Sequence, residues 1–497
     1  MFIILLLFFT LITCIVCYKE CRKPRKFPPG PRWLPLVGCF LTFQRMKAKM
    51  GYLYLVFHQL SKQYGTVLGV KLGRQKIVIV SGNNLIKKVL MKQEFNGRPD
   101  GFFFRVRSFG KRKGILFTDG PSWYQTKRMT MKYLSNCGFG HELMDRCLKY
   151  EAEMLVSFFK DEIARGRESF SVEEAFNTAV LNTLWTMIAG YRFTYGDFKL
   201  QPVLSAVREA FESNDTLGGI ISQLPFLRHI IPESSGYNNL MKVLHTLWCF
   251  IEDEIDNHVK AQRFDQSPSN FIDAYLVGSC NGETKNFSFD REELIVICLD
   301  LFLAGSKTTT DSLTAIFALL LHYPNWMKAL QKDIDTVVGS IDSPSQEHMQ
   351  LLPRVEAFLA EAHRTLILTP LGVPHRTIED VSLEGYHIPK DTVILLNFHS
   401  ANTDESCWEK PQEFHPERFL DESGQYRRRN EFIIFGLGKR RCLGEQLAKP
   451  SLFLFFTHIL HNFDLTVPQG SELPRLDGID GFTVSPRPYL IKLIPRK

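Results

Sequence analysis

The feature that most constrains this chain is a glycine-rich segment near its end, residues 435–444, which contains the single cysteine Cys442. The glycines allow a tight loop with inward-facing backbone N–H groups, and the helix predicted from Glu445 onward adds the positive end of its dipole. Both features stabilise a thiolate at Cys442. Such a thiolate can hold the iron of a haem as its axial ligand.

The same segment is compatible with two other interpretations. A glycine-rich loop also fits a buried structural cysteine, and Gly436 and Gly438 resemble the start of a dinucleotide-binding fingerprint. The fingerprint requires a third glycine where this sequence has Arg441, so we reject it. The structural cysteine stays as the alternative to an iron ligand.

The composition is that of a large globular protein. The 497 residues are 44% hydrophobic and 23% charged, which excludes disorder, collagen and a small secreted scaffold. The 60 Lys and Arg exceed the 53 Asp and Glu too little for a nucleic-acid groove. The eleven cysteines lack metal-type spacing and fit reduced thiols in a cytosol-facing chain.

The first residues predict a membrane anchor. Residues 1–18 include an uncharged apolar run from Phe2, which would span roughly 25 Å as a helix, close to the core of the endoplasmic-reticulum membrane. By the positive-inside rule, the basic flank places the rest of the chain in the cytosol; its members are Lys19, Arg22, Lys23, Arg25 and Lys26. A cleaved signal peptide is the alternative, but the charge follows the apolar run.

The remaining chain is predicted to be a linker and one domain. Residues 19–38 are basic and proline-rich, and their prolines favour a stiff extended spacer. Residues 39–497 form one large domain, since no further linker-like stretch interrupts them. Residues 66–72 and 76–81 predict a β-hairpin, and most later segments show helical periodicity. We therefore expect a mainly α fold with a small β part.

Three motifs accompany the Cys442 segment. They are Glu361-Ala362-His363-Arg364, Ala304-Gly305-Ser306-Lys307-Thr308-Thr309, and Trp123 with Lys127. In order and spacing the four elements resemble the cytochrome P-450 superfamily of haem-thiolate monooxygenases, over nearly the whole chain. The resemblance implies a single haem-binding fold with a long central helix, haem as cofactor and Cys442 as the ligand of its iron.

The Glu361 motif is predicted to be structural. An i, i+3 spacing puts the carboxylate of Glu361 and the guanidinium of Arg364 on one face of a helix. The resemblance adds Arg418 and implies a buried triad that locks the segment before the Cys442 loop through charged hydrogen bonds.

The Thr308 motif lies in a long apolar helix expected from about residue 294 to residue 322. Gly305 weakens helix propensity and the Thr308 hydroxyl can bond back to the Ala304 carbonyl, so a local opening that accommodates dioxygen is cheap. The resemblance implies a catalytic site formed by these three residues, with Thr308 helping to deliver protons.

One residue of that motif departs from the family. An acid usually precedes the threonine, whereas this sequence has Lys307. A solvated helix face and a desolvated proton donor with a lowered pKa are both open for Lys307. Asp300 and Asp311 are candidate substitutes for the acid.

Several residues are candidates for haem contacts. Trp123 and Lys127 share a helical face and together would hold a propionate. The resemblance adds further contacts at Arg440, Phe435, Arg98 and His375. The family normally has Arg where this chain has Lys127.

Electrons are expected from a partner, because the chain has neither a Rossmann fingerprint nor a P-loop. A basic face would steer an acidic donor; its residues are Lys127, Arg128, Lys132, Lys439, Arg440 and Arg441. The resemblance implies the NADPH-dependent flavoprotein reductase of the same membrane. A solvated face without a partner is the alternative.

The substrate is expected to be lipophilic. Residues 102–104 fall where relatives have a pocket roof, and residues 224–227 with 230–232 fall in their lipid-dipping entrance. Within the superfamily the sequence resembles insect hormone-pathway enzymes, one group of which epoxidises methyl farnesoate to juvenile hormone. Ecdysteroid or xenobiotic hydroxylation is an alternative, and a haem-thiolate isomerase that needs no reductase is an alternative of another class.

Overall fold

Helices make up most of the fold, as predicted. The computed structural model describes residues 2–261, 268–280, 290–339 and 341–496. Its helices are α1 (Phe2–Cys21), α2 (Phe40–Met50), α3 (Leu53–Tyr64), α4 (Asn83–Met91), α5 (Phe102–Val106), α6 (Gly120–Asn136), α7 (Glu142–Ala164), α8 (Val172–Ala189), α9 (Leu200–Glu212), α10 (Gly219–Gln223), α11 (Leu227–Ile230), α12 (Tyr237–Ala261), α13 (Phe271–Cys280), α14 (Arg291–His322), α15 (Pro324–Val338), α16 (Pro353–Thr365), α17 (Phe398–Asn402) and α18 (Glu445–Asn462). Short 3₁₀ turns are η1 (Gln93–Phe95), η3 (Gln346–Leu351), η4 (Pro416–Phe419) and η5 (Gly438–Arg440).

The strands form small sheets. They are β1 (Val67–Leu72), β2 (Gln75–Val80), β3 (Phe170–Ser171), β4 (His375–Arg376), β5 (Val381–Leu383), β6 (Tyr386–Ile388), β7 (Val393–Leu396), β8 (Phe463–Thr466), β9 (Gly478–Asp480), β10 (Val484–Pro486) and β11 (Leu490–Pro495). The largest sheet has the order β1-β2-β7-β4, and the others are β3-β11-β8, β10-β9 and β5-β6.

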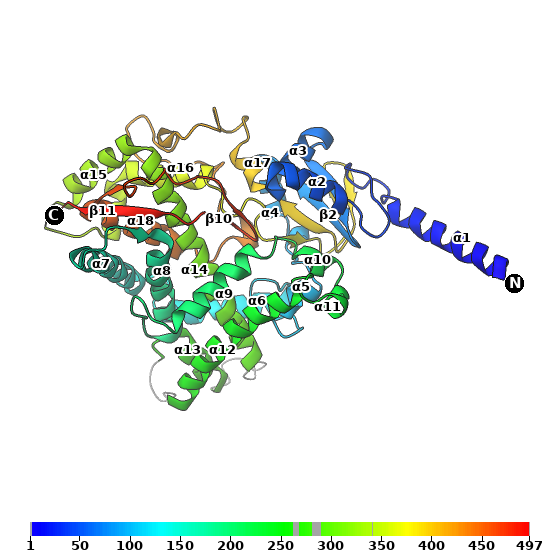
Figure 1. The fold of residues 1–497 in the computed structure, drawn as a ribbon, viewed down its shortest axis with the longest axis horizontal. Helices are drawn as coiled ribbons and strands as arrows, with labels where there is room; N and C mark the ends of the chain where they lie inside the picture. Colours follow the sequence, from blue (N-terminus) through cyan, green and yellow to red (C-terminus); the bar gives the residue numbers. More distant parts are fainter. Residues whose placement is uncertain (1, 262–267, 281–289, 340, 497) are drawn as a thin grey trace.

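The predicted hairpin is confirmed. Strands β1 and β2 pair antiparallel from Val67 opposite Val80 to Leu72 opposite Gln75, and β2 continues parallel to β7. Val, Ile and Leu side chains of these strands are almost entirely shielded from solvent, which is typical of a sheet covered on both faces. Figure 1 shows this sheet with α2 and α3 at the end of the body from which α1 projects.

Helix α14 runs through the middle of the body (Figure 1). The prediction of a long helix ending at His322 is confirmed, and the helix begins at Arg291 rather than near Leu294. Asp290 caps its first turn by accepting the backbone N–H of Glu293 at 3.0 Å. Apolar residues on several faces of α14 pack against α8, α12, α15, α16 and α18, as expected of a buried central helix.

The N-terminal helix α1 has no buried residue along residues 4–21, a stretch that is long and apolar enough to cross a membrane. It extends three residues beyond the predicted end at Tyr18 and includes Lys19 in its last turn.

The proline-rich segment after α1, which the sequence predicted to be a stiff extended spacer, packs against the sheet. The backbone N–H of Gly69 in β1 donates to the Pro29 carbonyl at 2.7 Å, and a Cβ at Gly30 would come within 2.2 Å of the Gly69 carbonyl oxygen. Phe27 and Trp33 are buried with their rings edge to face, 5.6 Å apart. The hydrogen bond, the close backbone approach and the buried rings together attach the segment to the sheet.

Candidate active site

One cavity of about 390 Å³ brings together the main motifs of the sequence. One part of its wall is the α14 turn with Ala304, Gly305 and Thr308, and another is the loop with Phe435 and Cys442. The predicted cofactor contacts Arg98, Trp123, Lys127, His375 and Arg440 line the same cavity. Its size is typical of sites for small molecules.

The Cys442 loop is shaped by its glycines. Gly436 and Gly438 have φ of 70° and 68°, and a Cβ on Gly438 would lie 2.4 Å from the Leu90 carbonyl oxygen. The Cys442 backbone N–H donates to the Phe435 carbonyl at 2.8 Å and closes the loop. The Cys442 side chain is accessible from the cavity.

The electrostatics at Cys442 differ from the expectation in one respect. The N–H groups that face the sulfur belong to Gly444 and Glu445, at the start of α18, and they lower the pKa of the thiol as predicted. Desolvation by the surrounding protein is the larger effect, so the net pKa is raised. Coordination to a metal ion deprotonates a thiol outright, whatever its pKa in the free protein.

Basic side chains on another wall of the cavity are fixed by backbone carbonyls rather than by carboxylates. Arg98 Nη1 donates to the Val373 and Pro374 carbonyls at 2.9 and 2.8 Å. Arg440 donates to the carbonyls of Asn96 and Thr118 at 2.9 and 2.7 Å. Lys127 Nζ donates to the Lys439 carbonyl at 2.9 Å. The carbonyls carry no net charge, and Asp119 offsets only part of the positive charge of Arg98 and Arg440, so this wall suits an anionic group.

Two further observations support an anion at this wall. Burial and the charge of Arg440 lower the pKa of Arg98, whose buried Nε has no hydrogen-bond partner among the described residues. Burial and then Arg98 lower the pKa of His375, so its imidazole is neutral. His375 Nδ1 lies 2.8 Å from the Phe95 carbonyl, which makes this residue a hydrogen-bonding group rather than a cation.

Trp123 has a supporting position. Its indole Nε1–H donates to the Ile115 carbonyl at 3.1 Å, so it is not directed at a ligand. The Arg440 guanidinium lies 3.7 Å from the centre of its ring, and Lys127 Nζ lies 5.1 Å from it. Trp123 therefore orients the cations through cation–π contacts.

The α14 turn is continuous. The Thr308 hydroxyl donates to the Ala304 carbonyl at 2.7 Å, as predicted, but no helical break opens beside it. Gly305 has a packing role instead, because a Cβ there would come within 2.5 Å of the Leu184 side chain on α8.

The Glu361 triad is assembled as predicted. Arg364 makes a bidentate pair with Glu361, both bonds being 2.7 Å, and Arg418 Nε lies 3.1 Å from Glu361 Oε1. The side chains of Glu361 and Arg364 have no exposed surface. Arg364 also donates to the Asn402 and Pro411 carbonyls, so the pair fixes the segment that leads to the Cys442 loop.

A match to known families decides the identity of the fold. Residues 28–493 match the family model described as cytochrome P450. The chain belongs to the cytochrome P450 family. Membership implies haem as the cofactor and a monooxygenase reaction.

Named relatives cover almost the full chain. Farnesoate epoxidase of Bombyx mori is 36% identical over 473 residues, which is 95% of this chain and 94% of the relative. A probable cytochrome P450 305a1 of Drosophila melanogaster is 33% identical, with 96% of each chain covered. Cytochrome P450 2J1 of Oryctolagus cuniculus is 34% identical, over 96% of this chain and 93% of the relative.

The residues of the cavity fit the haem of a cytochrome P450. The accessible Cys442 sulfur offers an iron ligand. The cations of the wall, which form no ion pair within the described part of the chain, and the orphaned Nε of Arg98 suit the propionates. Leu301, Leu366 and Leu447 contribute apolar lining. The residues that would hold the group are therefore Cys442, Arg98, Arg440, Lys127 and His375.

Lys307 is the residue at which this chain departs from the family pattern, and the structure supports neither of the two roles that the sequence left open for it. Its side chain is only 3% exposed and its Nζ lies 2.6 Å from Asp311 Oδ1 and 3.2 Å from Glu173 Oε1. Burial by itself lowers the pKa of Lys307, but the two carboxylates outweigh it and raise the pKa. Lys307 is thus a buried ammonium, neither solvated nor a donor with a lowered pKa, and it does not line the cavity.

Asp300 and Asp311, the two candidate substitutes for the usual acid, lie in different surroundings. Asp300 lines the cavity, pairs with Arg107 and accepts the backbone N–H groups of Ile115 and Leu116 at 2.7 and 3.0 Å. Asp311 belongs to the Lys307 cluster outside the cavity. Of the two, only Asp300 has access to it.

The predicted basic face is reduced by two members, because Lys127 and Arg440 both line the cavity and are half-buried. Arg440 points into the cavity wall, whereas Lys439, Arg441, Arg128 and Lys132 are exposed. Arg441 pairs with Glu445 at 2.7 Å.

Sequence reasoning missed one cavity wall, residues 366–369. These residues connect the Glu361 helix to the segment before His375, and their place between two identified motifs was the available signal. The predicted roof, Phe102, Phe103 and Phe104, is not part of the lining. Phe104 instead packs on Phe117, with ring centres 5.1 Å apart.

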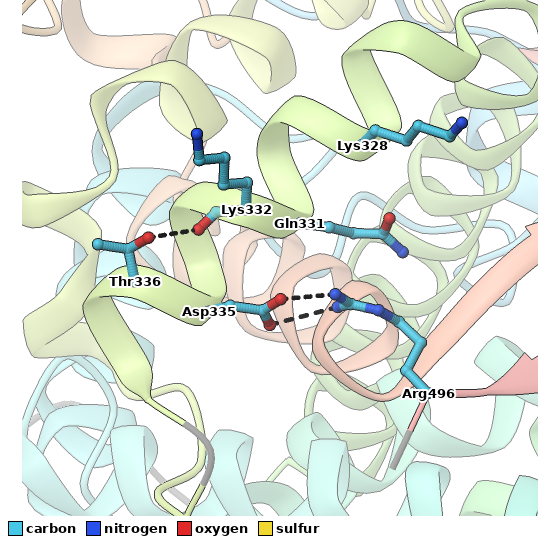
Figure 2. A pocket seen from close by; sticks show the side chains of 6 residues that line it. All are labelled: Lys328, Gln331, Lys332, Asp335, Thr336 and Arg496. Atoms are coloured by element: carbon cyan, nitrogen blue, oxygen red, sulfur yellow. Dashed lines mark hydrogen bonds and ion pairs between the residues drawn. The ribbon is translucent and has the colours of Figure 1, made fainter.

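A second hollow lies on the surface of α15 (Figure 2). Asp335 and Arg496 form an ion pair there, and Arg496 also donates to the Leu460 carbonyl at 2.8 Å. The ion pair attaches the end of β11 to α15, and the hollow contains none of the predicted site residues.

Proposed function

We propose that this protein is a membrane-bound monooxygenase that inserts one oxygen atom from O₂ into a lipophilic substrate. The specific reaction that we propose is the epoxidation of methyl farnesoate to juvenile hormone. The observation that carries the proposal is the lining of one apolar cavity by both Cys442 and the Thr308 turn. The likeness to a farnesoate epoxidase supports the substrate. Bound haem supplies the activation of dioxygen.

The chain's own residues have distinct roles in this proposal. Cys442 is the iron ligand, while Arg98, Arg440 and Lys127 bind the propionates. Thr308 holds a proton donor next to the oxygen site, because its hydroxyl is fixed by the Ala304 carbonyl and faces the cavity. Electrons come from NADPH through a flavoprotein reductase that docks on the exposed basic residues.

The proposed location is the endoplasmic-reticulum membrane with the body in the cytosol. Helix α1 would be the anchor, and basic residues follow its apolar part. Phe226, Ile230 and Ile231 are exposed apolar side chains at α11. Figure 1 shows α10 and α11 at the end of the body from which α1 projects, where they would meet lipid.

The test uses the purified full chain with reductase, NADPH and one of three substrates: methyl farnesoate, an ecdysteroid precursor or a model drug. We expect a substrate-induced spectral shift and an NADPH-dependent epoxide with methyl farnesoate. Turnover of only the steroid or the drug would favour the alternative hydroxylases. Turnover of a peroxide without reductase would favour an isomerase.

We expect the Thr308→Ala variant to separate oxygen consumption from product formation, because it removes the hydroxyl that positions the proton donor. The ratio of product formed to NADPH consumed should fall at least about tenfold. Thr310→Val is the matched control, since Thr310 is on the same helix but outside the cavity lining. An unchanged ratio in Thr308→Ala would contradict the role of Thr308.

We expect Arg98→Leu to weaken haem retention, because one charged hydrogen-bonding partner of the propionates is lost. Haem transfer to an excess of a haem-scavenging protein should become about ten- to a hundredfold faster. Arg105→Leu is the control, since Arg105 is exposed and pairs with Asp100 outside the cavity. Equal transfer rates in the two variants would rule out this role for Arg98.

A further inference from the structure

The buried cluster around Lys307 extends to the hairpin formed by β9 and β10 near the C-terminus. Asp311 accepts Lys307 with one carboxylate oxygen and the hydroxyl of Ser485 in β10, at 2.9 Å, with the other. Glu173 of α8 accepts Lys307 and also pairs with Arg208 of α9. Lys307 and Asp311 therefore join α14 to α8 and β10, and Glu173 extends the cluster to α9.

The same hairpin holds a wall of the cavity. The backbone N–H of Val484, next to Ser485, donates to the Leu368 carbonyl at 2.7 Å, and Leu368 lines the cavity. A continuous path thus runs from the turn that carries Thr308, through Lys307, Asp311 and the hairpin, to the Leu368 wall.

The path has little freedom to move. The side chains of Lys307 and Asp311 are 3% and 1% exposed, and Ser485 is fully buried. At the tip of the hairpin, the Phe482 backbone N–H donates to the Phe211 carbonyl at 2.7 Å, and a Cβ on Gly481 would lie 2.2 Å from the same oxygen. Water cannot readily replace the internal partners of such buried charges, so the spacing between the elements is fixed.

We propose that Lys307 is a positioning residue that determines regioselectivity. Through Asp311 and Ser485 it sets the separation between the Thr308 turn and the Leu368 wall, and thereby selects which carbon of a lipophilic substrate lies next to the oxygen site. Small displacements of a bound substrate change reaction rates strongly, so the path needs only to shift the wall slightly. This inference rests on the proposed monooxygenase function and gives Lys307 a role although its side chain does not line the cavity.

The test compares two variants that each remove one hydrogen bond between the C-terminal segment and α14. Ser485→Ala removes the bond to Asp311, and Tyr489→Phe removes the 2.7 Å bond from its hydroxyl to the Thr314 carbonyl, away from the cavity. A terpenoid ester with several double bonds is oxidised, and the positional isomers of the product are quantified together with haem content and melting temperature.

We expect Ser485→Ala to change the ratio of positional isomers about three- to tenfold with normal haem content, and Tyr489→Phe to leave it unchanged. Lys307→Arg, which keeps the charge, should resemble the native enzyme more closely than Lys307→Met. An unchanged ratio in Ser485→Ala, or equal changes in both single-bond variants, would overturn the proposal. If the native chain does not epoxidise the ester, the proposed substrate is wrong, and the isomer ratios of a hydroxylated steroid or drug then provide the same test.

Discussion

The Cys442→Ser variant is expected to lose the red-shifted Soret band that thiolate-bound haem shows when it is reduced and exposed to carbon monoxide. A serine hydroxyl keeps the shape of the loop but is a far weaker ligand for the iron than a thiolate. Monooxygenase activity should fall below detection, since the thiolate supplies the electron density that favours O–O cleavage. The measurement is the reduced carbon monoxide difference spectrum, normalised to protein.

Cys407→Ser is the matched control, because Cys407 is a free thiol outside the cavity lining. It should retain the native spectrum. If Cys442→Ser kept the same red-shifted band, another residue would hold the iron, and Cys442 would have only a structural role.

The Glu361→Ala variant is expected to abolish haem incorporation and soluble folding. Removing this carboxylate leaves the guanidiniums of Arg364 and Arg418 without their shared partner in a buried site. Breaking a single buried pair costs about 3–5 kcal/mol, which is a large part of the stability of a domain. The readouts are the yield of soluble protein and its haem content.

Asp333→Ala provides the comparison for Glu361→Ala. Asp333 pairs with Arg354, whose side chain is 42% exposed, so its loss should cost less than about 1 kcal/mol. A Glu361→Ala protein that is stable, fully loaded with haem and altered only in its products would show that the triad acts on the substrate instead.

The sequence by itself predicted the elements whose structure depends on nearby residues. The β-branched residues on both sides of a Gly-Arg-Gln turn predicted the β1–β2 hairpin, and the long apolar pattern predicted α14 to within three residues of its start. The i, i+3 spacing of Glu361 and Arg364 was enough to predict their contact, because one helical turn brings them together. The family motifs then placed Cys442, Thr308 and the cations together, and they line one cavity.

Only the tertiary structure decided the roles that depend on distant partners. Lys307 is a buried ammonium because α14 lies inside the fold, where Asp311 on the next turn and Glu173, 134 residues earlier in the chain, both pair with it. Arg440 turns inward because carbonyls of remote segments accept its donors, and the proline-rich segment docks because β1 offers a glycine that allows close approach. In each case the charge, direction and contacts of the residue depend on its burial and on a partner far away in the sequence. The periodicity of the sequence contains no information about either.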